Sequence, residues 1–320
     1  MASLKDKNNS SAEGATIGNA HTATPIQEPT PQPHPAPVPD PEAAYTASGS
    51  TETQTSRDPK DTTFKCTITD KRTPILILFG PSQCGKSMTM VRLVRFLRTL
   101  GYTVEPKRDF RPADDNIYEL RCQEFNNTID TYKPLPGTDW QDYMLANVAD
   151  SRGNSVLQIL EAPGEAYFSL TEQNPLKKPF PAYLNTIKNS QAPKIWCFFI
   201  EPNWKTDKHS QYVERIKIAK KSFMGGEQKN KYIILYNKID MVPTLMKDSG
   251  KPNMKALLQF ADDQYPGLFK AFQNKRIIEK TWRPYLCEFV PFSTGDFSDG
   301  DFTESHDQYP AALLSKIKIR

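Results

Sequence analysis

The residues best suited to chemistry lie in Gly80–Ser87, which reads GPSQCGKS. This run fits the pattern G-x-x-x-x-G-K-[ST], and it has an apolar strand pattern before it and an amphipathic helix pattern after it. The glycines allow the backbone to curl, so that N–H groups and the helix N-terminus face phosphate oxygens. Lys86 would contact the β- and γ-phosphates, and the Ser87 hydroxyl would bind Mg²⁺. The residues expected around the phosphates are Gly80, Ser82, Gln83, Cys84, Gly85, Lys86, Ser87 and Met88.

A second motif, Asn237–Asp240 (NKID), directly follows the apolar run Lys231–Tyr236. The Asp240 carboxylate could accept two hydrogen bonds from guanine, whereas adenine would leave it unpaired. Asn237 could bind the base and tether the phosphate loop, while the aliphatic stem of Lys238 covers the ring. The motif therefore predicts a guanine nucleotide, GTP or GDP, as the ligand.

In this order, and each at a strand end, the two motifs resemble those of the Ras-like, translation-factor-related P-loop GTPases, over roughly residues 74–317. The resemblance implies a Ser-Ala-type loop against the guanine carbonyl, for which Ser293 and Thr294 are the matching residues. It also implies a D-x-x-G station, which here reads Glu161-Ala-Pro-Gly164. There Glu161 would hold Mg²⁺ through a water, and the Gly164 N–H would bind the γ-phosphate.

The residues near the γ-phosphate decide how hydrolysis would proceed. Glu165 stands where the family often has a water-positioning Gln or His, and a carboxylate beside phosphate oxygens is repelled. We therefore expect slow hydrolysis without a partner, with Lys86, Gly164 and Glu165 as the catalytic residues. Thr138 is the expected switch threonine and Mg²⁺ ligand, with Thr131 as the alternative.

Short apolar runs alternate with helical patterns from residue 64 onward, which predicts an α/β fold with a mostly parallel sheet and helices on both faces. The resemblance makes this a P-loop, Ras-like G domain with insertions. The expected strands are 74–79, 195–200, 231–236, 286–292 and a hairpin of 143–148 with 155–160, and the expected helices are 87–100, 114–130, 166–188, 207–223, 253–275 and 308–317.

The first 63 residues have a different composition from the rest of the chain. They contain nine of the 27 prolines and carry a net charge of −4, which leaves +8 for residues 64–320. A Pro-rich segment with few aliphatic residues cannot offset its chain entropy by burial. We expect a disordered tail over 1–63 and a G domain over 64–320, with insertions near 101–141 and 241–285.

Composition also excludes several classes. No apolar run approaches the roughly 18 residues of a membrane helix. The five cysteines contain no Cys-x-x-Cys pair, so neither a zinc site nor a disulfide framework is indicated, and a reducing cytoplasm is expected. The mild, dispersed positive charge makes nucleic acid an unlikely partner. We interpret Arg108, Arg111, Arg152, His209 and His306 as solvated surface residues.

The predicted function is a Mg²⁺-dependent GTPase that switches protein partners through its insertions, switch segments and tail. A non-hydrolysing GTP-binding interaction protein is the alternative, motivated by Glu161 and Glu165. A further alternative is a P-loop ATPase or small-molecule kinase in which the NKID tetrapeptide occurs by chance. The insertions and the tail also resemble, weakly, divergent bacterial GTPase domains of the double-GTPase type. The sequence does not identify the partners, and it leaves open whether the protein forms a nucleotide-dependent dimer.

Overall fold

The computed structural model describes residues 66–131, 143–170, 173–202, 208–223, 230–247, 250–274, 276, 281, 283–298 and 301–318. All of them belong to one compact unit, Ser56–Arg320. The predicted tail over 1–63 and the predicted switch residue Thr138 lie outside the described residues.

A seven-stranded sheet forms the centre of this unit, with the order β2-β3-β4-β1-β5-β6-β7. Among the described strands of this sheet, β3 runs antiparallel to both of its neighbours, and the pairs from β4 to β7 are parallel. The prediction of a mostly parallel α/β sheet is confirmed. The strands are β1 Ile75–Phe79, β2 Thr103–Pro106, β3 Met144–Ala149, β4 Ser155–Glu161, β5 Lys194–Ile200, β6 Lys231–Tyr236 and β7 Cys287–Pro291.

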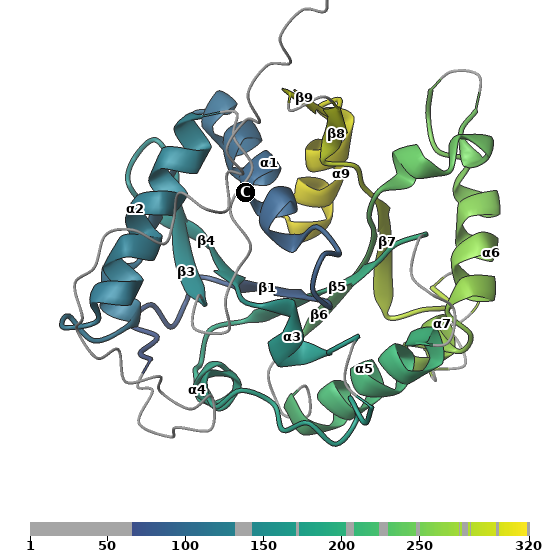
Figure 1. Ribbon diagram of the computed structural model, residues 1–320, viewed down its shortest axis with the longest axis horizontal. Coiled ribbons are helices and arrows are strands. Elements are labelled where there is room, and N and C mark those ends of the chain that lie inside the picture. Colours follow the sequence, from purple (N-terminus) through teal and green to yellow (C-terminus); the bar gives the residue numbers. More distant parts are fainter. Residues whose placement is uncertain are drawn as a thin grey trace, which may run out of the picture. The chain divides into compact units, whose positions relative to one another are not determined.

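Helices cover both faces of the sheet. Figure 1 shows α1, α2 and α9 over one face and α4 and α5 over the other. A small separate hairpin, β8 Gly295–Ser298 with β9 Asp301–Glu304, precedes α9. The helices are α1 Lys86–Thr99, α2 Asn116–Asp130, α3 Gly164–Tyr167, α4 Tyr183–Asn189, α5 His209–Phe223, α6 Met254–Gln264, α7 Leu268–Ala271 and α9 Gln308–Ile317, with short 3-10 turns η2 Arg108–Phe110, η4 Ile239–Met241 and η5 Pro243–Leu245.

The central strands are apolar along their whole length because both of their faces are covered. Every residue of β1 and of β5 is buried, as is usual for parallel strands under two helix layers. Because β4, β1, β5, β6 and β7 run parallel, the loops that follow them lie together at one edge of the sheet.

Two helix predictions are wrong in extent. Among the described residues of the segment 166–188, helix is confined to the end of α3 and to α4, because Pro175, Pro179 and Pro181 cannot continue a helix. The segment 253–275 is divided into α6 and α7 at Gly267, whose φ of +81° ends one helix before the other begins. The edge strand β2, inside the predicted insertion 101–141, was missed because four residues are too few to show a clear alternation of polar and apolar side chains.

Candidate functional site

The loop between β1 and α1 needs glycine at two positions for steric reasons. A Cβ at Gly80 would lie 2.6 Å from Cys84 Sγ and 2.8 Å from Phe199 Cβ. Gly85 has a φ of +86°, and a Cβ there would lie 2.3 Å from Asn237 Nδ2. Both glycines of the motif are therefore required by the packing of the loop itself.

Lys86 begins α1 with a buried side chain that turns back into this loop. Its Nζ donates a hydrogen bond of 2.8 Å to the carbonyl oxygen of Pro81. The neighbouring Cys84 is fully buried, and burial raises the pKa of its thiol to about 11. Cys84 is consequently a packing residue rather than a nucleophile, since the neutral thiol is its stable form at pH 7. Ser82 and Met88 are half-buried beside it, and Gln83 is exposed.

The NKID motif is joined directly to the phosphate loop. Asn237 Nδ2 donates a 2.9 Å hydrogen bond to the Cys84 carbonyl, which is the tether expected from the sequence. Lys238 donates from Nζ to the Gln83 carbonyl at 3.0 Å and forms an ion pair with Glu201. Glu201, buried at the end of β5, is a site residue that sequence reasoning missed. Its position directly after an apolar strand was the available signal.

The predicted base-binding residues lie on adjacent segments at the ends of β6 and β7. The Ile239 N–H donates to the Phe292 carbonyl at 3.2 Å, which holds the NKID turn against the loop that carries Ser293 and Thr294. Both of these residues are buried, whereas Asp240 is exposed in η4. The structure therefore brings the two halves of the predicted guanine site together and leaves the Asp240 carboxylate accessible.

Two of the three predicted metal residues, Ser87 and Glu161, are in direct contact with each other. The Ser87 hydroxyl donates a 2.7 Å hydrogen bond to Glu161 Oε1. Glu161 is only 1% exposed, and its other oxygen, Oε2, lies 3.7 Å from Nη2 of Arg121 in α2. Arg121 is likewise only 4% exposed, and the sequence analysis did not single it out. It was missed because no feature of the sequence distinguishes Arg121 from the other polar residues of α2.

Gly164 packs against the phosphate loop. A Cβ at this position would lie 2.1 Å from both the carbonyl carbon of Pro81 and the nitrogen of Ser82. The turn after β4 is thus placed beside the phosphate loop, as the resemblance implies. The Glu165 side chain lies outside the described part of the structure, and Thr131, the alternative switch threonine, is exposed at the C-terminal end of α2.

These contacts decide the fold class. The chain has the α/β fold of a P-loop nucleotide-binding protein. Its phosphate loop joins the first strand to α1, and the NKID turn after β6 is hydrogen-bonded to that loop. The carboxylate at the end of β4 bonds the serine of the same loop.

No protein-family model and no curated protein matches the chain. Among solved structures it is similar to nucleolar GTP-binding protein 1 of Plasmodium falciparum (13% identity, 80% of this chain and 89% of that chain, TM-score 0.36). It is also similar to the GTP-bound Ski7 GTPase-like domain of S. cerevisiae (14%, 78% and 51%, TM-score 0.37), about half of which it spans. A third is the signal recognition particle receptor SRb-GTP/SRX complex of Chaetomium thermophilum (13%, 72% and 96%, TM-score 0.36). These structures are of GTP-binding or GTPase-like proteins, but the fold assignment rests on the contacts described above.

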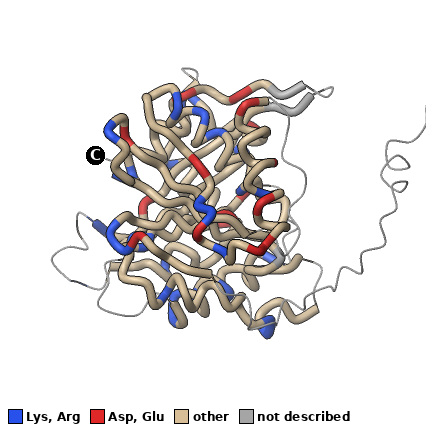
Figure 2. The backbone as a smooth tube through the Cα atoms, turned by 90° about the vertical axis from the view of Figure 1, so that its left-hand side faces the viewer, with Lys and Arg blue, Asp and Glu red and all other residues tan. Residues whose placement is uncertain are grey.

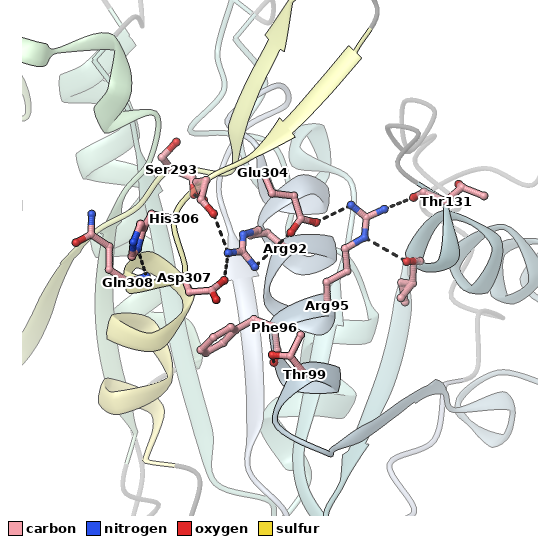
Figure 3. Close-up of polar contacts among 12 residues, drawn as sticks. Arg92, Arg95, Phe96, Thr99, Thr131, Ser293, Glu304, His306, Asp307 and Gln308 are labelled. Atoms are coloured by element: carbon pink, nitrogen blue, oxygen red, sulfur yellow. Dashed lines mark hydrogen bonds and ion pairs between the residues drawn. The ribbon is translucent and has the colours of Figure 1, made fainter. Parts of the chain in front are cut away.

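Two arginines of α1 connect the loop that carries Ser293 and Thr294, called the base loop below, to the end of α2 (Figure 3). Ser305 Oγ donates to the Ser293 carbonyl at 2.6 Å, and the buried Arg92 donates to the Ser305 carbonyl at 2.8 Å. Arg95 pairs with Glu304 at 2.7 Å and also donates to the Thr131 carbonyl. Sequence reasoning missed this cluster because Arg92 and Arg95 are more than 200 residues from Ser305 and Glu304 in the chain.

Two of the predicted surface residues are in fact buried. Arg111 pairs with Asp115, and its guanidinium lies 4.6 Å from the centre of the Tyr143 ring. His209 stacks on Tyr265 with ring centres 4.3 Å apart. The interpretation of Arg111 and His209 as surface residues is therefore wrong. It is confirmed for the remaining three, Arg108, Arg152 and His306, which are exposed.

Charges of both signs are mixed over the folded unit. In the view of Figure 2, Lys and Arg are interspersed with Asp and Glu along the described part of the chain. Within the described residues, no helix is long and apolar enough to cross a membrane.

Proposed function

We propose that this chain binds GTP and GDP and hydrolyses GTP with Mg²⁺ as a nucleotide-dependent switch. The observation that carries the proposal is the 2.9 Å bond from Asn237 Nδ2 to the Cys84 carbonyl. It couples a base-recognition motif to a phosphate loop. An NKID tetrapeptide that occurred by chance would not be expected to contact that loop. The exposed Asp240 carboxylate would select guanine by accepting two hydrogen bonds from it.

The residues present fit a Mg²⁺ ion. Glu161 holds the hydroxyl proton of Ser87, so the lone pairs of Ser87 Oγ are available to a cation. Glu161 Oε2 is buried and has no hydrogen-bond partner among the described residues, which suits a carboxylate that would hold a metal-bound water. Ser87 would bind the ion directly, with Thr138 as the proposed third protein residue. When bound, Mg²⁺ would neutralise charge on the phosphates.

The chain's own groups supply the remaining charge stabilisation. Lys86 would exchange the Pro81 carbonyl for phosphate oxygens, and the Gly164 N–H would bond the γ-phosphate from its place beside Pro81. A water in line with the γ-phosphate would be the nucleophile. Glu165 is a poor group for positioning it because its carboxylate is repelled by the phosphate, so we propose that hydrolysis is slow without a partner.

The two predicted insertions are the proposed sites for protein partners. Large apolar side chains are exposed on both, with Ile117 and Leu120 on α2 in the first and Met241 and Met254 in the second. Leu120 has 60% of its surface exposed. Exposed large apolar side chains one turn apart on a helix, such as Ile117 and Leu120, are typical of surfaces that bind a protein partner.

Single-turnover hydrolysis by the purified protein tests this function. With GTP and Mg²⁺, we expect phosphate release in a single exponential over minutes to hours, because the Glu165 carboxylate is a poor group for positioning the water. The matched control is Lys86→Met, which should abolish release. Tight GTP retention with no release over a day would contradict the hydrolytic part and favour the alternative, a non-hydrolysing GTP-binding interaction protein.

A further inference from the structure

Helix α2 presents a buried guanidinium at the candidate metal site. Arg121 Nη2 lies 3.7 Å from Glu161 Oε2, and Nη1 lies 3.4 Å from Glu124 Oε2 at the rim. Arg121 Nε is buried without a hydrogen-bond partner among the described residues. A guanidinium has five N–H donors, and these partners use only part of them.

Glu161 balances the charge of Arg121 without satisfying its donors. The 3.7 Å separation is longer than a hydrogen bond, and the other carboxylate oxygen already accepts the Ser87 hydroxyl. Burial of unused charged donors is costly, so a site that keeps them calls for an anionic ligand. Ser87 directly follows Lys86 in the first turn of α1. The Glu161 carboxylate contacts both Ser87 and Arg121, so the Arg121 donors lie close to the phosphate loop.

We propose that Arg121 binds a phosphate oxygen of the bound nucleotide and thereby makes nucleotide affinity only weakly dependent on Mg²⁺. This inference rests on the proposed function, because it takes the ligand of the loop to be a nucleotide. A planar guanidinium matches phosphate geometry and carries its charge permanently. Because the charge of Glu161 is already balanced by Arg121, a divalent cation gains less at this site than it would beside an unpaired carboxylate.

The test is the affinity for a fluorescent, non-hydrolysable GTP analogue, measured by anisotropy at constant ionic strength with Mg²⁺ and with EDTA. For the wild type we expect EDTA to weaken binding by less than about tenfold. In EDTA, Arg121→Met should weaken it by a further factor of about 10 to 100, which is the usual value of a hydrogen bond to a charged group. The control is Arg108→Met. It removes an exposed arginine of η2 that pairs with Glu119 of α2, and it should leave nucleotide affinity unchanged.

A double variant separates phosphate binding from charge balance. Arg121→Met together with Glu161→Gln leaves no unpaired buried charge, and near-UV circular dichroism verifies its fold. Because EDTA removes the metal, the role of Glu161 toward Mg²⁺ does not enter. The double variant should bind as weakly as Arg121→Met does.

Three results would overturn the inference. One is an EDTA effect on the wild type larger than tenfold, and the second is wild-type affinity for Arg121→Met in EDTA. The third is recovery of wild-type affinity in the double variant, which would mean that Arg121 only balances Glu161. If the wild type binds no GTP analogue even with Mg²⁺, the proposed function itself fails, so the two failures are distinguishable.

Discussion

At the scale of single residues, the site depends on close approaches that only glycine allows. Gly80 and Gly85 make room inside the phosphate loop, and Gly164 makes room between that loop and the turn after β4. The first two could be predicted from the motif. The contact of Gly164 with Pro81 could not, since it depends on how β4 and β1 are placed side by side in the sheet.

Gly164→Ala should therefore damage both the stability and the site. The added Cβ would overlap backbone atoms, which cannot move aside as a flexible side chain could. We expect a loss of about 1–3 kcal/mol in the free energy of unfolding, measured in urea, and weaker nucleotide binding. Gly250→Ala is the matched control: its φ of +71° makes alanine costly for the backbone, but a Cβ there meets nothing within 4 Å in the described structure, so this variant should lose stability without losing nucleotide affinity. Equal nucleotide affinity for the two variants would count against the close approach.

At the scale of elements, α1 connects the base loop to the end of α2. Arg95 lies between Glu304 of β9 and Thr131 (Figure 3). It also donates to the carbonyls of Thr128 and Ile129. The helix and its apolar face could be predicted from the spacing of its residues, but these polar contacts could not. Arginines on a helix look alike in sequence, and only the tertiary fold decides which of them become buried.

Arg95→Met should loosen both elements that it joins. We expect a loss of about 1–3 kcal/mol in the free energy of unfolding, because three carbonyls and a carboxylate lose a charged donor. Hydrogen exchange should speed up at the end of α2 and in the segment 303–307. Arg98→Met, which removes an exposed pair with Asp130 one turn along the same helix, should change stability by no more than about 0.5 kcal/mol. Unchanged exchange rates in Arg95→Met would show that the cluster does not hold these segments.

At the scale of the whole chain, the sequence predicted the α/β class, most strand positions and the order in which the motifs meet. The central strands are five to seven residues long and wholly or mostly apolar, so their pattern is unambiguous. The 166–188 helix prediction failed because the prolines of this segment break the helix that its apolar spacing indicates. Arg121 was missed because its role depends on α2 crossing the end of β4, a long-range placement that no local pattern encodes.

Competition for labelled GDP tests the central claim, that this fold recognises guanine, most directly. We expect unlabelled GDP to displace the label at least about a hundredfold more effectively than ADP or ATP, because adenine leaves the Asp240 carboxylate unpaired. We also expect Asp240→Asn to shift preference toward xanthine nucleotides, whereas Asp262→Asn, an exposed carboxylate change on α6, should leave it unchanged. Equal displacement by adenine and guanine nucleotides, with no effect of Asp240→Asn, would contradict this claim.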